Sequence, residues 1–472
     1  MTSVNLDDYV GSPERLLSAS LKLIEENSQD EFDRFHLAAF NRRLTAIGPA
    51  IAPISAIMNN RAGQEIAEHS DIAAFLLEHE VYKSYPLSFI EKGQYDRLTT
   101  WLSRLTTHDL SSVDAKSCTS IDEWIDEVDA KTPIRLMHSS GTTGKLSFIP
   151  RSTLEQDTWL KAIFGYFNNF GYEENVTIGE FQQAPFIYMG YRHGATAHNR
   201  LIESAELQLY GNPSMIYTLY PGRMSAEVLA LGGRLQAADA SGARGEIQLT
   251  PSLRRLRDAY LEEKDQTSLR TETFFDRIAT ELRGKPITMV ATPGQIYDFA
   301  QAGLSKGMGR LFSPKSNILV GGGLKGRDLP DDWDQIVEDF FGMKKLRQSY
   351  GMTETIAPVP ECEAGNFHLH PIYIPFVIDN ETGGALPRRG VQTGRFGLID
   401  LSAQTHWGGF LTGDYVSMAH GDVTCDCGRN GPYLFPEIQR HTAKEGGDDK
   451  ITCSATPQVH SDALTYLAKM EG

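Results

Sequence analysis

Two short stretches decide the fold class: ITMVATPG at residues 287–294 and NILVGGG at residues 317–323. Each is an apolar run that ends in turn-forming residues, a pattern typical of strands buried on both faces. We therefore expect strands over Ile287–Ala291 and Asn317–Val320. A helical pattern follows near Asp331 to Phe341. Alternating strands and helices indicate an α/β fold of layered sheets and helices with a substantially parallel sheet.

Helical patterns dominate the first 130 residues. Ser120 and Glu123 have the spacing of a capping box, in which each side chain accepts a hydrogen bond from the other residue's backbone N–H. The box precedes a segment, Ile121 to Val128, whose apolar residues recur at helical spacing. We therefore expect the N-terminal part, to about residue 130, to be helical.

Strand patterns dominate from about residue 371, over Ile372–Ile378, Gly397–Leu401 and Phe410–Met418. The segment that follows Arg440, residues 441–472, is too short for an independent domain of usual size. We therefore predict one large domain over 1–440 that includes a small β-rich subdomain over about 371–440.

The composition excludes several classes of partner. The chain has 61 acidic and 45 basic residues and a formal net charge of −16, so it lacks the overall basic character of a nucleic-acid-binding domain. The N-terminus has no basic stretch followed by an apolar run, and no apolar segment is long enough to span a bilayer. Five cysteines in 472 residues do not form a disulfide framework. We expect a cytoplasmic protein with no membrane span and no nucleic-acid partner.

The most informative loop is SSGTTGK at residues 139–145. Glycines let backbone amides approach an anion closely, hydroxyl groups donate hydrogen bonds, and a lysine supplies positive charge. The loop is not a Walker loop, because Ser139 stands at the first glycine position, Leu146 follows Lys145, and extended chain rather than a helix is expected next. We predict a phosphate-binding loop of another kind, with a polar turn that binds nothing as the alternative. Its residues are Ser139, Ser140, Gly141, Thr142, Thr143, Gly144 and Lys145.

Further motifs follow this loop along the chain. GGG occupies residues 321–323, SYGMTE residues 349–354 and TGD residues 412–414, and Arg440 lies beyond them. In this order the motifs resemble those of the adenylate-forming superfamily, which includes acyl-CoA synthetases, luciferases and nonribosomal adenylation domains. The resemblance spans about residues 135–440 and implies the large N-terminal domain of that superfamily.

The resemblance implies a role for each motif. Tyr350 is expected to stack on adenine, Thr353 to contact a phosphate and Glu354 to hold Mg²⁺. Asp414 is expected to bind the ribose hydroxyls, and Arg440 to be a second nucleotide-binding residue. The expected catalytic residues are Lys145, Thr353 and Glu354. The expected ATP site comprises the loop residues together with Gly321, Gly322, Gly323, Ser349, Tyr350, Gly351, Met352, Thr353, Asp414 and Arg440.

The residue types suit this chemistry independently of the resemblance. A carboxylate is a poor electrophile, and its attack on the α-phosphate of ATP converts it into a mixed anhydride with AMP. That step depends on positioning and on charge stabilisation. Glu354 offers the oxygen ligands that Mg²⁺ prefers, and the two oxygens of Asp414 can accept two hydroxyl groups. Taken alone, Asp414 is typical of a turn residue after glycine, and Glu354 is typical of a surface charge or of a residue at the start of a helix.

A group of cysteines narrows the resemblance to one subgroup of the superfamily. Cys362 follows the SYGMTE motif, His368 lies shortly after it, and Cys425 and Cys427 form a Cys-x-Cys pair. This part resembles phenylacetate–CoA ligases and the acyl-protein synthetases of bacterial luminescence, some of which use such residues to bind zinc. The resemblance implies a structural Zn²⁺ site made of these four residues, with His370 as an alternative imidazole. Three thiolates and one imidazole suit a closed tetrahedral site; reduced cysteines without a metal are the alternative.

The loop departs from the superfamily pattern just after its lysine. Leu146 and Ser147 stand where the superfamily usually has a proline and a second lysine. The phosphate charge is then expected to fall to Lys145 alone, or to Lys145 with help from Arg151.

The C-terminal part departs further. Superfamily members carry a mobile C-terminal domain with a catalytic lysine, whereas residues 441–472 resemble only a short, vestigial remnant of it. Lys450 and Lys469 match no such lysine motif. Acyl-protein synthetases carry an acyl group on a cysteine near the C-terminus, which makes Cys453 a candidate carrier, although we favour an ordinary strand cysteine.

The acyl pocket is the least defined part of the expected site. Tyr188, Tyr191 and His193 fall where the superfamily places residues of this pocket, and Gly323 is expected to line it as well. Core packing of these aromatic side chains is an equal alternative.

The sequence thus predicts an enzyme that uses MgATP to activate a carboxylic acid as an acyl- or aryl-adenylate. The acyl group is expected to pass to a thiol or amine acceptor, such as CoA or a carrier or partner protein. One alternative is an amide-forming ligase, or activation of a non-carboxylate substrate, on the same fold. The other is a non-catalytic, nucleotide-binding partner subunit.

Overall fold

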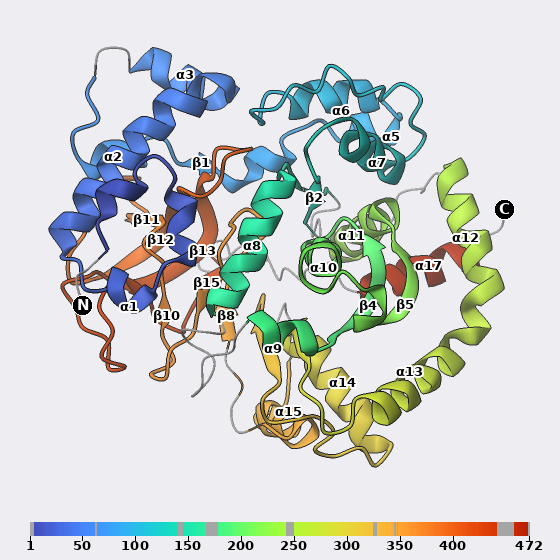
Figure 1. Ribbon diagram of the computed structural model, residues 1–472. Coiled ribbons are helices and arrows are strands. Elements are labelled where there is room, and N and C mark those ends of the chain that lie inside the picture. The colour runs from blue at the N-terminus through green and yellow to red at the C-terminus, as the bar shows by residue number, and fades with distance from the viewer. Residues whose placement is uncertain are drawn as a thin grey trace.

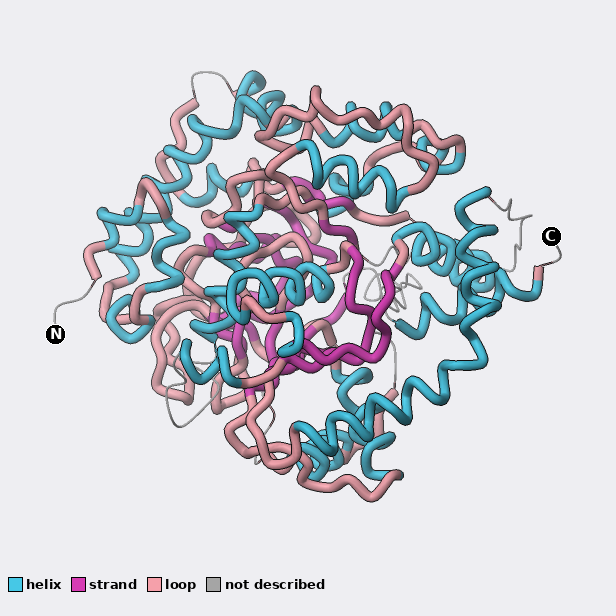
Figure 2. The backbone as a smooth tube through the Cα atoms, turned by 45° about the vertical axis from the view of Figure 1, so that its right-hand side comes forward, coloured by secondary structure: helices cyan, strands magenta, loops and turns pink. Residues whose placement is uncertain are grey.

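The structure is a computed structural model, and it describes residues 4–61, 64–139, 145–166, 178–241, 250–323, 328–343, 346, 348–440 and 457–470. The fold is mixed α/β. Two views show the strands gathered in the interior, with helices around them (Figure 1, Figure 2). No helix within those ranges is both long enough and apolar enough to cross a membrane.

The strands expected over 287–291 and 317–320 are confirmed, and they lie at the centre of a six-stranded sheet. The strand order is β5, β4, β6, β7, β8, β9, and every neighbouring pair is parallel except β8 with β9. The two runs are apolar because most residues of β6 and β7 are buried. The strands are β4 Phe186–Gly194, β5 Ile216–Met224, β6 Thr288–Ala291, β7 Asn317–Gly321, β8 Gln348–Tyr350 and β9 Val359–Pro360.

Helices α13 Thr267–Glu281, α14 Pro293–Ser305 and α15 Trp333–Phe341 share a core with this sheet. The helix expected near Asp331 to Phe341 is therefore confirmed as α15. The α14 helix starts sharply after β6, because the Thr292 side chain accepts a hydrogen bond from the Gln295 backbone N–H and a proline occupies the first helical position.

The strand-rich region expected from about residue 371 forms a second, mostly antiparallel sheet of seven strands. Its main path is β10, β14, β13, β12, β11, with β1 and β15 also paired to β13. The strands are β1 Leu77–Glu78, β10 Phe367–His368, β11 Tyr373–Ile378, β12 Val391–Asp400, β13 Gly409–Ala419, β14 Tyr433–Leu434 and β15 Gln439–Arg440.

The N-terminal helices pack on this second sheet, so the first part of the chain and the strand-rich region share one core. Phe40 and Phe75 pack against Trp407 at ring-centroid distances of 5.9 and 6.4 Å. Figure 1 shows α2 beside β11 and β12. The helices of this layer are α1 Leu21–Ile24, α2 Gln29–Ile47, α3 Ala52–Asn60 and α4 His69–Ala73.

A third group of elements carries the SSGTTGK loop. The antiparallel strands β2 Met137–His138 and β3 Phe148–Ile149 form a hairpin around it. Their core includes α7, which begins at Ile121 as predicted. Only half of the predicted capping box forms: Ser120 Oγ accepts from the Glu123 N–H at 3.1 Å, but the Glu123 carboxylate accepts from the Thr119 N–H instead. The helices of this group are α5 Ser88–Glu91, α6 Tyr95–Leu102 and α7 Ile121–Lys131. Helices α8 Thr153–Tyr166, α9 Ile178–Gln183 and α10 Ala197–Ser204 share another core with β4.

A C-terminal helix, α17 Pro457–Lys469, packs on α11 Ala226–Ser241 and α12 Pro251–Glu263. Leu464 and Leu467 are buried there against Val228 and Leu253. Figure 1 shows this red helix beside β4 and β5. Residues 441–456, with Lys450 and Cys453, lie outside the described residues.

Candidate functional site

The two sheets meet at a contact between three of the predicted nucleotide-binding residues. Tyr350 ends β8 of the parallel sheet, whereas Asp414 lies within β13 and is paired in register with Arg440 of β15. The Tyr350 hydroxyl donates to Asp414 Oδ2 at 2.7 Å, and Arg440 Nη1 lies 3.0 Å from Asp414 Oδ1. Burial and the Asp414 charge raise the pKa of Tyr350 well above its usual value, so the phenol stays protonated and donates. Each oxygen of Asp414 keeps accepting capacity for a further hydroxyl group.

The next residues along the chain hold Glu354 in a buried position. The Glu354 side chain is 9% exposed, and burial raises the pKa of its carboxyl while the Arg151 guanidinium opposes that rise. The Thr353 and Thr355 carbonyls accept hydrogen bonds from Arg151, and the Glu354 carbonyl accepts one from His406 Nε2 at 3.1 Å. The backbone that carries Thr353 and Glu354 is therefore fixed by buried side chains from other elements. Nothing in the local sequence around Arg151 or His406 marks them for this task.

The structure describes the base of the hairpin formed by β2 and β3, which we call the phosphate-loop hairpin. Ser139 N–H donates to the Ser147 carbonyl at 3.0 Å, and Ser147 N–H donates to Ser139 Oγ at 3.1 Å. Lys145 Nζ lies 4.7 Å from the centroid of the Tyr85 ring, and burial lowers the pKa of Lys145. The extended chain expected after the loop is confirmed by β3. The predicted residues Ser140, Gly141, Thr142, Thr143 and Gly144 lie outside the described residues.

The GGG stretch lies directly beside the strand that bears Tyr350. Gly321 pairs with Ser349 across β7 and β8, and a Cβ atom on Gly321 would come within 2.7 Å of Ser349 Oγ. Gly322 and Gly323 have φ angles of 82° and 63°, which favour glycine. The structure thus brings the GGG and SYGMTE motifs together. Gly351 and Met352 continue the chain from Tyr350, with Met352 packed against the core of the second sheet.

The residues expected in the acyl pocket lie in different surroundings. Tyr188 is 1% exposed and stacks on His198 at a centroid distance of 5.5 Å, within the core around α8 and α10. Tyr191 stacks on Tyr220 at 4.7 Å, and its hydroxyl lies 3.2 Å from His460 Nδ1 of α17. His193 is exposed at the surface.

The four predicted zinc ligands lie together at the edge of the second sheet. Their candidate ligand atoms all lie within 4.8 Å of one another. Cys362 Sγ lies 3.8 Å from Cys425 Sγ, and Cys427 Sγ lies 3.4 Å from His368 Nε2. His370 stands apart from this group, and its Nδ1 accepts a hydrogen bond from the Ile372 N–H at 3.2 Å. Three sulfur atoms and one imidazole match the donor set of a structural Zn²⁺ site.

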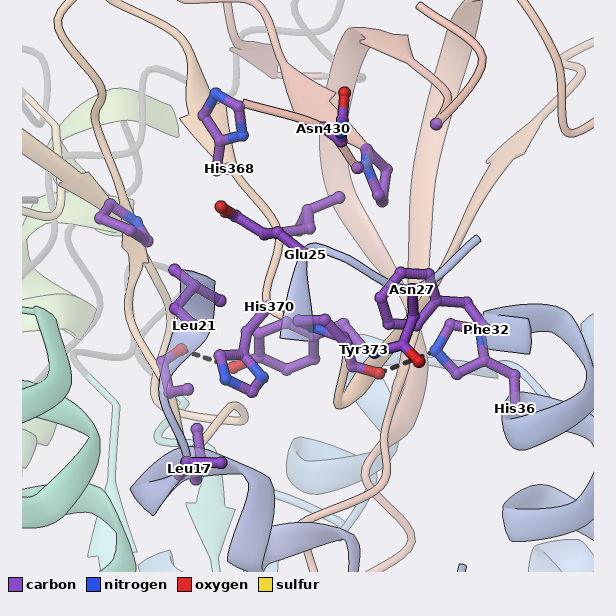
Figure 3. A pocket seen from close by; sticks show the side chains of 18 of the residues that line it. Leu17, Leu21, Glu25, Asn27, Phe32, His36, His368, His370, Tyr373 and Asn430 are labelled. Atoms are coloured by element: carbon purple, nitrogen blue, oxygen red, sulfur yellow. Dashed lines mark hydrogen bonds between the residues drawn. The ribbon is translucent and has the colours of Figure 1, made fainter. Parts of the chain in front are cut away.

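A pocket of about 90 Å³ lies between the N-terminal segment and the loops around residues 357–360, 368–371 and 430–432 (Figure 3). The view shows His36 and His370 on either side of Tyr373. His36 Nε2 lies 2.7 Å from the Pro371 carbonyl, and burial lowers the pKa of His36 to about 3 and that of His370 to about 4. Both imidazoles are therefore neutral at pH 7. No sequence motif marks this pocket, because its walls come from segments far apart in the chain.

Comparisons with known proteins find likeness among solved structures. No family model matches the chain, and no curated protein matches it. A 2-hydroxyisobutyryl-CoA ligase, solved with 2-HIB-AMP and CoA, is 13% identical with a TM-score of 0.46, over 87% of this chain and 70% of that one. MatB from Rhodopseudomonas palustris, solved with ATP, is 14% identical with a TM-score of 0.34, over 67% and 52%. The luciferase-like enzyme of the mealworm Zophobas morio is 12% identical with a TM-score of 0.33, over 65% and 56%. This chain thus spans about half the length of the last two.

Proposed function

We propose that this chain uses MgATP to activate a carboxylic acid as an acyl- or aryl-adenylate, as members of the adenylate-forming superfamily do. The contact of Asp414 with both Tyr350 and Arg440 carries the proposal. Three residues expected to surround one nucleoside come from three separate strands, and they meet although no short-range pattern requires it. Glu354 follows Tyr350 closely and is held in a buried position.

In this proposal each residue has a defined task. The Tyr350 ring supports the adenine, and Asp414 accepts hydrogen bonds from the ribose hydroxyls while Arg440 balances its charge. Lys145, Thr353 and the SSGTTGK loop hold the phosphates. Glu354 holds Mg²⁺, which, when bound, neutralises part of the phosphate charge.

The reaction follows from this arrangement. A carboxylate oxygen of the acid forms a bond to the α-phosphorus as the bond from that phosphorus to the bridging oxygen breaks. Pyrophosphate leaves with the bonding electron pair. The chain's own residues position the reactants and stabilise charge. We propose that a thiol or amine, on CoA or on a carrier or partner protein, then accepts the acyl group.

An ATP–pyrophosphate exchange assay over a panel of aryl and fatty acids tests the proposal. We expect acid-dependent exchange, and we expect Glu354→Gln to lower it by about 100-fold, the scale seen when a preorganised electrostatic group is removed. Glu281→Gln is the control, since that side chain is 46% exposed and pairs with Arg277. Absence of exchange with every acid, while a known adenylating enzyme is active, would contradict the proposal. So would full exchange by Glu354→Gln.

We also propose that Cys362, His368, Cys425 and Cys427 hold a structural Zn²⁺ ion. Protein purified without chelators is expected to contain about one zinc per chain, because metal binding to such a site is coupled to folding. Cys425→Ser is expected to lose the zinc and to melt at a lower temperature. Cys118→Ser, at a cysteine outside the cluster, is expected to keep it. Zinc-free wild-type protein, or Cys425→Ser with a full equivalent, would rule the site out.

A further inference from the structure

We infer that Arg151 is a positioning residue that fixes the Glu354 segment and couples it to the phosphate-loop hairpin. The inference rests on the proposed function, because it assigns Glu354 to Mg²⁺. It differs from both alternatives of the sequence analysis, in which Lys145 holds the phosphates alone or with direct help from Arg151.

The contacts of Arg151 surround Glu354 on both sides along the chain. Arg151 Nη2 donates to the Thr353 carbonyl at 2.6 Å and also to the Thr355 carbonyl. His406 Nε2 holds the carbonyl between them, that of Glu354. Three successive carbonyls are therefore bound by two buried side chains, which leaves the Glu354 backbone little freedom to rotate.

A set of buried carboxylates supports this arrangement. Asp400 Oδ2 accepts from the Ile356 N–H at 2.8 Å, which fixes the residue after the clamped carbonyls. Glu155 accepts from the Thr405 N–H at 2.9 Å and so holds the loop that bears His406. The carboxylates of Glu155, Asp400 and Glu354 all interact electrostatically with the Arg151 guanidinium. A neutral side chain at position 151 would remove part of the positive charge that offsets these buried carboxylates, of which Arg43 supplies another part for Asp400 and Glu155.

Arg151 itself is tied to the hairpin. It follows β3 by two residues, and its carbonyl accepts from the Arg135 N–H at 2.6 Å, beside β2. The side chain is 1% exposed and lies over the Trp159 ring at 5.4 Å. Its Nη2 is thus directed toward backbone carbonyls inside the protein, whereas Nε and Nη1 are buried without a hydrogen-bond partner among the described residues. Arg151 thus contacts the phosphate-loop hairpin through its backbone and the Glu354 segment through its side chain.

The test compares nucleotide binding with and without Mg²⁺ by calorimetry. We expect the wild-type protein to bind ATP more tightly with Mg²⁺ than with EDTA. We call the ratio of the Kd for ATP in EDTA to the Kd for ATP with Mg²⁺ the Mg²⁺ gain. In Arg151→Gln we expect this gain to fall at least 5-fold, while the Kd for ATP in EDTA changes by a smaller factor. A merely structural arginine would not change the two affinities unequally.

Arg388→Gln is the matched control. Its side chain is 16% exposed, donates to the Pro375 carbonyl at 2.7 Å and pairs with Asp33, so it is a similarly packed arginine outside the Glu354 segment. We expect this variant to keep the wild-type Mg²⁺ gain even where its melting temperature falls. If Arg151→Gln does not fold, Arg151→Lys and His406→Gln serve in the same comparison, and both are expected to lose part of the gain.

The outcomes separate the inference from the proposed function. A folded Arg151→Gln protein with the full Mg²⁺ gain overturns the inference and leaves the proposed function standing. Mg²⁺-dependent ATP binding by the wild-type protein without exchange for any acid overturns the proposed function, and the Arg151 comparison still decides the inference. Absence of ATP binding by the wild-type protein overturns both.

Discussion

Asp414 and Glu354, to which we assign different tasks at the proposed site, lie in different surroundings. Asp414 has a hydrogen-bond partner on each oxygen, from Tyr350 and from Arg440. Glu354 is held by its backbone, and burial raises the pKa of its carboxyl. A carboxylate buried with few partners gains much from a bound cation, whereas a carboxylate with positioned donors is a fixed acceptor for hydroxyl groups.

This difference predicts the effect of Asp414→Asn. The amide keeps the size of the side chain but removes the charge and points donors toward Arg440 or Tyr350. A charge-assisted hydrogen bond contributes about 1.5–3 kcal/mol, so we expect the Kd for ATP to rise by about 10- to 100-fold. Asp379→Asn is the control, in an exposed turn where Asp379 accepts from the Thr382 N–H. Calorimetry that finds an unchanged Kd for Asp414→Asn would remove the ribose assignment.

At the scale of elements, helices α14 and α15 beside the parallel sheet pack closely against each other. Gly303 of α14 faces Phe340 of α15, and a Cβ at position 303 would lie 2.1 Å from a ring carbon. Phe340 is fully buried among other aromatic rings. Movement of the ring would therefore disturb its contacts with Phe299, Phe312 and Phe341.

Gly303→Ala is accordingly expected to destabilise the protein by about 1–3 kcal/mol, the usual range for overpacking, despite the better helix propensity of alanine. Gly309→Ala is the control, because the nearest atom to its added Cβ is 3.9 Å away. Thermal or urea unfolding measures both. Equal stability of the two variants would show that α14 and α15 separate more easily than their packing indicates.

Some elements and site residues could be predicted from the sequence because their signals are local. The strands β6 and β7 are apolar runs, and α15 has a helical pattern, so each was visible in one short window. The cysteines and His368 could be grouped only through the resemblance, yet the structure brings those four side chains together. Half of the Ser120 and Glu123 capping box failed because Thr119 offers the Glu123 carboxylate a competing N–H.

At the scale of the whole molecule, long-range packing left no local signal. The N-terminal helices cover a sheet built from the last quarter of the chain, and α17 packs on α11 and α12. The contact of Arg151 with the Glu354 segment joins residues about 200 positions apart. For the same reason the pocket in Figure 3 was not predicted. Pattern and spacing report which face of an element is buried, but not which distant element covers it.

A crystal structure of this chain with MgATP or a non-hydrolysable analogue tests the central claim most directly. We predict adenine against the Tyr350 ring, ribose hydroxyls within about 3 Å of Asp414, Mg²⁺ about 2.1 Å from a Glu354 oxygen, and phosphates along the loop at residues 139–145. A nucleotide bound elsewhere, for example in the pocket beside His36 and His370, with Glu354 and Asp414 out of contact with it, would contradict the account.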